Sequence, residues 1–168
     1  LWEFISNAQF NPNWNPVLDH VDSVRKEVYT MGHRNPYHPR IDAKSGWIFT
    51  GEIGPDARSN SATRGPHGME EWNLAVRPGF FGHPYCMGPN IGWNAITGAS
   101  GNTGTYGDPY NCAAVQNTSP NNNGIRNLPP ATAASLYYSS VANTGDNYRI
   151  GFTNARSAIG GPMYRYDT

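Results

Sequence analysis

Apolar and polar positions alternate over several short runs of the chain, in residues 27–31, 72–76 and 162–166. A period of two residues is that of a β-strand, whose successive side chains point to opposite faces. Residues 46–51 add a short aromatic and β-branched run enclosed by two glycines, which also favours a strand. Residues 43–46, just before it, are typical of a tight turn. The pattern therefore predicts an all-β chain of short strands.

Helical periodicity is poor, and residues 17–31 are the nearest candidate, although their β-branched residues suit strands as well. Two stretches are predicted as loops, residues 56–68 and a longer insertion of about 89–130. Structureless loops beyond ~15 residues are uncommon in compact domains. We therefore expect this insertion to belong to a domain larger than the 168 residues. Short strands with such loops are typical of a sandwich, a barrel or a propeller.

Charge and composition exclude several classes of function. Lys and Arg number 12, as do Asp and Glu, so the net charge is zero and no basic run is present. We therefore expect no nucleic-acid partner. No apolar run approaches the ~20 residues of a membrane-spanning helix, so we expect no transmembrane segment. Aromatic residues make up 12% of the chain, which argues against disorder.

The two cysteines, Cys86 and Cys112, flank a stretch rich in Gly, Asn, Ser and Thr. They form either one disulfide, which would restrict this loop, or two buried free thiols. Asn117 begins the one Asn-x-Ser/Thr triplet and is a candidate glycosylation site. A disulfide and a glycosylated asparagine would both place the protein outside the cytoplasm, secreted or periplasmic.

Four motifs follow one another between residues 32 and 84. They are Gly32-His33-Arg34-Asn35-Pro36, Gly51-Glu52-Ile53-Gly54-Pro55, Glu70-Glu71-Trp72-Asn73 and Gly79-Phe80-Phe81-Gly82-His83-Pro84. Their order resembles the glucose/sorbosone dehydrogenase family, soluble quinoproteins built on a six-bladed β-propeller. The resemblance implies that residues 1–168 form one partial propeller domain, a portion of about two to three blades with long loops.

The resemblance also implies roles for particular residues. Arg34 and Asn35 would face the central cavity and contact pyrroloquinoline quinone (PQQ). The carbonyl oxygens of Gly54 and Pro55 would bind the Ca²⁺ that also holds the quinone, since Ca²⁺ takes hard oxygen ligands. Glu71 and the carbonyl oxygen of Phe81 would bind a second, structural Ca²⁺.

The implied function is the oxidation of a sugar or a sugar-derived alcohol with PQQ and calcium, with electrons passing to an external acceptor. The family's histidine base precedes the first motif by roughly two blades, so we expect the general base to lie outside this segment. The rest of the propeller, or partner chains, would complete the fold. The alternative is a non-catalytic secreted propeller that binds carbohydrate or protein, or that builds an extracellular assembly.

Other polar residues permit further interpretations. His33 and His38 could suggest a metal pair, but Pro36 and Pro39 break any helix that would align them. His33 could also be a base, although packing or hydrogen bonding is the favoured role because the family accepts Phe at this position. Two of the acidic residues Glu52, Asp56, Glu70 and Glu71 could form the carboxylate pair of a glycoside hydrolase. The favoured interpretation is that these four carboxylates are solvated or bind calcium.

Overall fold

A computed structural model describes residues 28–97, 104–124, 126–139 and 157–162, together with Tyr164 and Tyr166. These residues contain ten β-strands and no helix, which confirms the all-β prediction. In chain order the strands are β1 (Thr30–Met31), β2 (Pro36–Ile41), β3 (Ile48–Glu52), β4 (Met69–Ala75), β5 (Gly79–Phe80), β6 (Cys86–Met87), β7 (Ile91–Gly92), β8 (Asn94–Thr97), β9 (Thr105–Pro109) and β10 (Leu136–Ser139).

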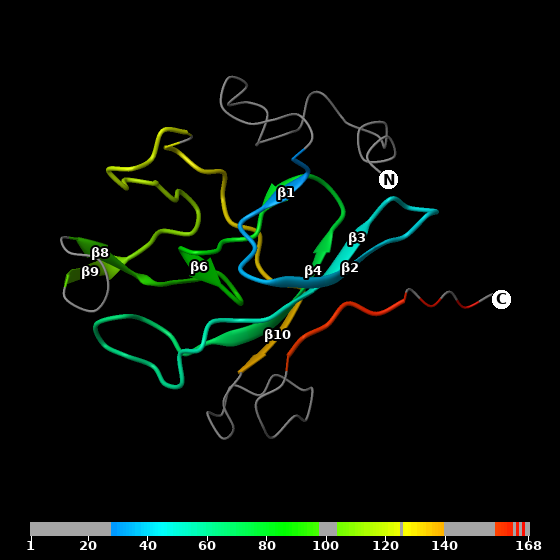
Figure 1. Cartoon of the computed structure of the whole chain (residues 1–168), viewed down its shortest axis with the longest axis horizontal. Coiled ribbons are helices and arrows are strands. Elements are labelled where there is room, and N and C mark those ends of the chain that lie inside the picture. Colours follow the sequence, from blue (N-terminus) through cyan, green and yellow to red (C-terminus); the bar gives the residue numbers. More distant parts are fainter. Residues whose placement is uncertain are drawn as a thin grey trace.

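The central element is a four-stranded antiparallel sheet with the strand order β10-β4-β3-β2 (Figure 1). β2, β3 and β4 pair in the order in which they follow one another in the chain. β10 pairs with β4 although the insertion separates the two strands in the sequence. An antiparallel sheet of four strands is the repeating unit of a β-propeller. The described residues thus contain one sheet with the size of a blade, and the count of two to three blades stays a prediction.

The β2–β3 hairpin forms at the predicted turn. The side chain of Asp42 accepts hydrogen bonds from the backbone N–H and the hydroxyl of Ser45, and the backbone N–H of Asp42 donates to the carbonyl of Trp47 at 2.9 Å. Gly46 closes the turn with a φ of 73°, in the left-handed region that glycine enters without steric cost. A short polar side chain and a glycine thus suffice to reverse the chain here.

One face of β4, the face of Glu70 and Trp72, is covered by residues 157–162, which run beside the β2–β3 hairpin (Figure 1). The indole N–H of Trp72 donates to the carbonyl of Ile159 at 3.1 Å, and the N–H of Gly160 donates to the carbonyl of Tyr37 at 3.1 Å. A Cβ on Gly51 would overlap the backbone of Ile159. Glycine is therefore required in β3 because another segment crosses it at backbone distance.

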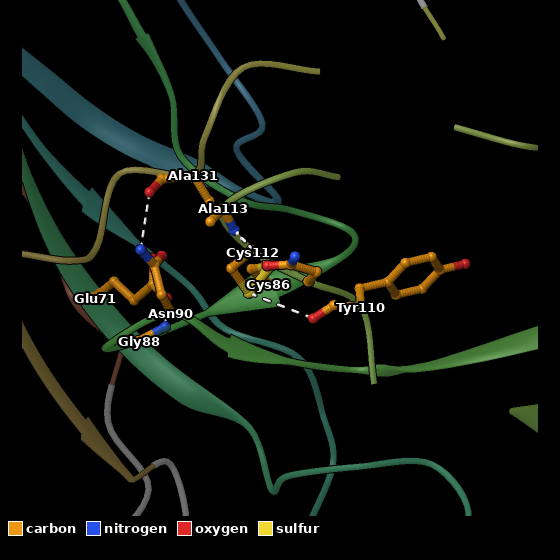
Figure 2. Close-up of a disulfide and its surroundings, with 9 residues drawn as sticks. Glu71, Cys86, Gly88, Asn90, Tyr110, Cys112, Ala113 and Ala131 are labelled. Carbon is orange, nitrogen blue, oxygen red and sulfur yellow. Dashed lines mark hydrogen bonds between the residues drawn. A yellow bond between two sulfur atoms is a disulfide. The ribbon is translucent and has the colours of Figure 1, made fainter. Parts of the chain in front are cut away.

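The insertion after β4 is held by the disulfide between Cys86 and Cys112, whose Cα atoms are 6.0 Å apart (Figure 2). This confirms the bridge and removes the alternative of two free thiols. Both half-cystines lie in a buried cluster with Phe80, Val115 and Ala131. The short hairpins β6–β7 and β8–β9 extend from this cluster, so the predicted loop region carries regular structure of its own.

Other predicted strands differ from the structure. Of residues 27–31, Thr30 and Met31 form β1, which pairs in parallel with β5, and Glu27 lies outside the described residues. Of residues 162–166, the described Pro162, Tyr164 and Tyr166 are not in a strand; the two tyrosines are 83% and 78% exposed, so the alternation corresponds to no buried face. Residues 17–31 were a candidate for a helix or a strand. Their first part, residues 17–27, lies outside the described residues, and the described remainder contains β1. Within the described part of the chain, no helix has the length and apolar character that crossing a membrane requires.

Candidate functional site

Two of the sequence motifs meet where β2 begins and β3 ends. The guanidinium of Arg34 donates to the carbonyl of Ile53 at 3.0 Å, and the N–H of Ile53 donates to the carbonyl of Asn35 at 3.1 Å. Arg34 also lies 3.6 Å from the carboxylate of Asp56, which is 99% exposed, so this ion pair adds little stability. Asn35 is exposed. The structure thus joins the Arg34–Asn35 turn, which is at least partly exposed, to the Gly54–Pro55 turn, in which Gly54 is buried.

Glu52 lies beneath the Arg34–Asn35 turn and is only 3% exposed. Its Oε1 accepts the backbone N–H groups of Arg34 and, at 3.3 Å, of Asn35. Its Oε2 accepts Nδ1 of His33 at 3.0 Å and Nδ2 of Asn73 at 3.1 Å. The ring of His33 also stacks on Phe81, with centroids 5.0 Å apart. His33 therefore packs and donates a hydrogen bond at this site.

Glu71 is directly opposite Glu52 in the register of β3 and β4. Its carboxylate accepts the N–H of Gly88, and Nδ2 of Asn73 at 3.1 Å (Figure 2 shows Glu71 beside Gly88). The pKa of Glu71 is raised to about 7: burial is the largest cause, the hydrogen bonds from Gly88 and Asn73 oppose it, and the facing carboxylate of Glu52 adds to it. Opposite carboxylates on one face repel, so this pair favours a proton or a cation between its members.

Glu70 points to the face of β4 opposite to that of Glu71, and it binds both the Gly54–Pro55 turn and the segment 157–162. It accepts the N–H of Gly54 and the N–H of Ala158, both at 3.2 Å. Burial raises the pKa of Glu70, while these two N–H groups and the charge of Arg34 lower it. Glu70 therefore fixes the Gly54–Pro55 turn from behind, where a Cβ on Gly54 would overlap the carbonyl oxygen of Met69.

A small cavity of about 10 Å³ lies between these groups, which is about the space of one water molecule. All four residues predicted to bind calcium line it, together with Arg34 of the first motif and two further motif residues, Glu52 and His83; the four are Gly54, Pro55, Glu71 and Phe81. The family resemblance implied two separate ions for these four residues. The structure brings them to the wall of one cavity with room for a single small group.

His83 belongs to the fourth sequence motif, which assigned no role to it. It lines the small cavity and is partly buried. Burial is the main reason that the pKa of His83 is lowered, with the charges of Arg34 and His33 adding to the effect and that of Glu52 opposing it. A neutral imidazole at the cavity wall is compatible with a bound cation nearby. Its place directly after Gly82 in the fourth motif was the signal that could have singled it out.

The acidic residues weighed in the sequence analysis divide into two groups. Asp56 is exposed, whereas Glu52, Glu70 and Glu71 are buried, so of the two favoured interpretations, solvated or calcium-binding carboxylates, the first is excluded for those three. They are buried because each accepts N–H donors, which offset the cost of removing a charge from water. Among the described residues no group of three or more His, Cys, Asp and Glu side chains is arranged to hold a metal.

The remaining candidates lie apart from this site. His38 is exposed and stacks on Tyr37 with centroids 4.5 Å apart, away from His33. The side chain of Asn117 accepts the N–H of Ser119 at 3.2 Å in an exposed turn.

A second, larger hollow of about 560 Å³ lies on the other side of Met69, which borders both spaces. Its lining combines amide and hydroxyl groups with apolar surfaces and includes Asn60, Ser61, Asn94, Ile91 and Tyr137. No Asp, Glu, Lys or Arg side chain is among the described residues that line it. A volume of this size is typical of small-molecule sites.

Comparison with known proteins gives one informative similarity. Over 104 residues the chain is 30% identical to quinoprotein glucose dehydrogenase B of Acinetobacter calcoaceticus. The match covers 62% of this chain and 16% of that protein, so the chain spans a small part of its relative. No family model matches the chain, and no solved structure matches it. The chain therefore contains a segment related to a quinoprotein dehydrogenase.

Proposed function

We propose that this chain forms one side of a quinone and calcium site in an extracytoplasmic oxidoreductase that acts on a sugar or a sugar-derived alcohol. The observation that carries the proposal is the small cavity, because it gathers Gly54, Pro55, Glu71 and Phe81 beside Arg34. The similarity to a quinoprotein glucose dehydrogenase supports the same chemistry. The disulfide supports a location outside the cytoplasm.

The residues present fit Ca²⁺. Carboxylate and backbone carbonyl oxygens are the hard ligands that this ion prefers, and Glu71 supplies a carboxylate at the cavity wall. No described N–H donates to the carbonyl oxygens of Gly54 or Pro55, so both are available as ligands. A cation here would also relieve the repulsion between Glu71 and Glu52.

The same residues fit one side of a PQQ site and not an enclosed pocket. Arg34 and Asn35 lie at an open face, and a guanidinium suits the carboxylates of a quinone acid. When bound, PQQ supplies the two-electron acceptor and Ca²⁺ supplies Lewis-acid polarisation. This chain's own residues bind and orient: Arg34 and Asn35 at the open face, Gly54 and Pro55 at the turn. The general base and the rest of the cavity belong, in this proposal, to other parts of the propeller or to partner chains.

The test is reconstitution of the full-length protein with PQQ and CaCl₂, read as quinone binding and as sugar-dependent reduction of an external dye. Arg34→Ala should abolish tight quinone binding. Arg40→Ala is the matched control, because Arg40 lies in β2, the strand that follows the Arg34–Asn35 turn, and its guanidinium donates to the carbonyl of Pro39 at 3.5 Å, outside the small cavity. Equal affinities of the two variants, or no quinone binding by the unmodified protein, would overturn the proposal.

A second candidate is carbohydrate binding without catalysis, and the larger hollow favours it. Amide groups beside an aromatic ring, with no Asp, Glu, Lys or Arg among the described lining residues, suit a neutral, hydroxyl-rich ligand. Binding to neutral oligosaccharides in EDTA, without quinone, tests this reading. Tyr137→Ala should then weaken binding, and Arg34→Ala should leave it unchanged; the reverse pattern favours the quinone site.

A further inference from the structure

The hydrogen bonds of Glu52 define a role that its motif does not reveal. An ionised carboxylate offers about four lone-pair positions. Four N–H donors fill them: the backbone groups of Arg34 and Asn35 on one oxygen, and the side chains of His33 and Asn73 on the other. No position remains for a metal ion or for a further hydrogen-bond donor, although Glu52 lines the small cavity.

Glu71, directly opposite, differs in this respect. It accepts two donors in the described structure, Gly88 and Asn73, so two of its lone-pair positions remain for a ligand. The single amide nitrogen of Asn73 donates to both carboxylates, at 3.1 Å each. One carboxylate of the facing pair is therefore saturated by the protein, and the other is available to the cavity.

We propose that Glu52 is a positioning residue, which holds the backbone of Arg34 and Asn35 so that their side chains present themselves to the open face. This inference rests on the proposed quinone function and deepens it. The turn is held from both ends: Glu52 binds its N–H groups, and the N–H of Ile53 binds the carbonyl of Asn35 at 3.1 Å. The guanidinium of Arg34 then reaches the carbonyl of Ile53, beside the Gly54–Pro55 turn.

An amide cannot replace this carboxylate. A Gln side chain has one acceptor oxygen with two lone pairs, and its NH₂ group would face two other N–H donors. Glu52→Gln therefore leaves buried donors unpaired on either side of the turn. A shorter carboxylate in Glu52→Asp keeps the charge but withdraws both oxygens by one methylene from the N–H groups of Arg34 and Asn35.

The matched control is Asp42→Asn. Asp42 is also a buried carboxylate, 7% exposed, which binds the backbone N–H groups of Lys44 and Ser45 at the far end of the same hairpin. The substitution removes comparable hydrogen bonds from the same sheet without touching the Arg34–Asn35 turn. A general loss of stability therefore affects both variants, whereas a loss of positioning affects only the variant at Glu52.

The experiment uses the full-length protein with CaCl₂ and measures two quantities in each variant. The first is the hydrogen-exchange protection of the Arg34 and Asn35 amides, and the second is the dissociation constant for PQQ below the melting temperature. Glu52→Gln should lose the protection and weaken PQQ binding at least about tenfold relative to Asp42→Asn, which corresponds to about 1.4 kcal/mol. If Glu52→Gln does not fold, Glu52→Asp is measured instead, with the same direction expected.

Unchanged protection of the two amides overturns the inference, and so does PQQ affinity equal to that of Asp42→Asn. In both cases the proposed quinone function survives, because the unmodified protein still binds PQQ. If the unmodified protein does not bind PQQ, the proposed function fails, and the positioning inference fails with it. The two failures are therefore distinguished by the unmodified protein alone.

Discussion

Glu52 and Glu71 are paired directly opposite each other across β3 and β4, and their carboxylates accept hydrogen bonds from the same nitrogen, Nδ2 of Asn73. Like charges in this arrangement are unfavourable. The arrangement persists because each carboxylate also accepts backbone N–H groups, Glu52 those of Arg34 and Asn35 and Glu71 that of Gly88. Repulsion between the two carboxylates lowers the free energy of unfolding unless a proton or a cation binds between them. We therefore expect the stability of the protein to depend on pH and on calcium.

The first prediction concerns pH in the absence of calcium. The pKa of Glu71 is raised to about 7, so the folded state binds a proton more tightly than the unfolded state does. The free energy of unfolding should therefore fall as pH rises from about 4.5 to about 7, by up to about 3 kcal/mol, and then level off. Glu71→Gln should flatten this decline, as measured by urea unfolding in EDTA from pH 4.5 to pH 8. An equally steep decline in Glu71→Gln and in the control Asp42→Asn would contradict the assignment.

The second prediction concerns calcium, which competes with that proton for the same carboxylate. A ligand that binds only the folded state raises the melting temperature according to its affinity. Millimolar CaCl₂ should therefore raise the melting temperature more at pH 8 than at pH 5, and the gain should disappear in Glu71→Gln. MgCl₂ at the same concentration should have a smaller effect because Mg²⁺ demands a stricter geometry. A gain independent of pH would place calcium elsewhere.

The third prediction concerns the disulfide. Cys86 and Cys112 are 26 residues apart and lie in the buried cluster with Val115. Their replacement by serine in a double variant should lower the free energy of unfolding by about 3–4 kcal/mol in the loop-closure model. Urea unfolding with and without a reducing agent measures this. The reducing agent should destabilise the unmodified protein and leave the double variant unchanged; an effect on both would show that the bridge is not its target.

Several elements could be predicted because their signals are local. The run that became β3 combines β-branched and aromatic residues between glycines, and the turn before it needs only Asp42 and Gly46. Two cysteines that flank a loop-rich stretch indicated either a disulfide or two buried free thiols, and the structure has the disulfide. Residues 162–166 show the limit of such signals, because the same alternation occurs in a segment whose described tyrosines are exposed.

The candidate site could be predicted only in part, because its chemistry depends on contacts between distant segments. The motifs identified Arg34, Gly54 and Glu71, which the structure places around one cavity. They did not reveal that Glu52 is saturated by donors from a turn about twenty positions earlier and from the neighbouring strand. Strand period indicates which residues share a face, but it does not indicate what that face will meet.

The fourth prediction concerns the turn that carries the proposed calcium ligands. A Cβ on Gly54 would overlap the carbonyl of Met69, whereas a Cβ on Gly161 meets no atom within 4 Å. Gly54→Ala should therefore push the turn away from β4 and cost on the order of 1–3 kcal/mol, while Gly161→Ala should change stability by less than about 0.5 kcal/mol. Thermal unfolding of both variants checks this. Similar melting temperatures for the two would contradict the close approach of Gly54 to β4.

The last prediction concerns residues 157–162, which cover the face of β4 that carries Glu70 and Trp72. The indole of Trp72 donates to the carbonyl of Ile159 across 87 positions of the chain, and its ring lies 5.5 Å from that of Tyr138. Trp72→Phe removes the donor but keeps an aromatic ring against Tyr138. It should therefore cost about 0.5–1.5 kcal/mol, the usual worth of one hydrogen bond.

The effect should be concentrated on the covering segment. The N–H of Gly160, which donates to the carbonyl of Tyr37, should exchange faster with solvent in Trp72→Phe. Trp47→Phe is the matched control, since Trp47 is 44% exposed at the hairpin turn and the hydrogen bond to its backbone carbonyl does not involve the ring. If both variants change the exchange of Gly160 equally, the indole of Trp72 does not hold the segment. If only Trp72→Phe does so, the indole of Trp72 helps to hold residues 157–162 on β4, beside the hydrogen bond from the N–H of Ala158 to the carboxylate of Glu70.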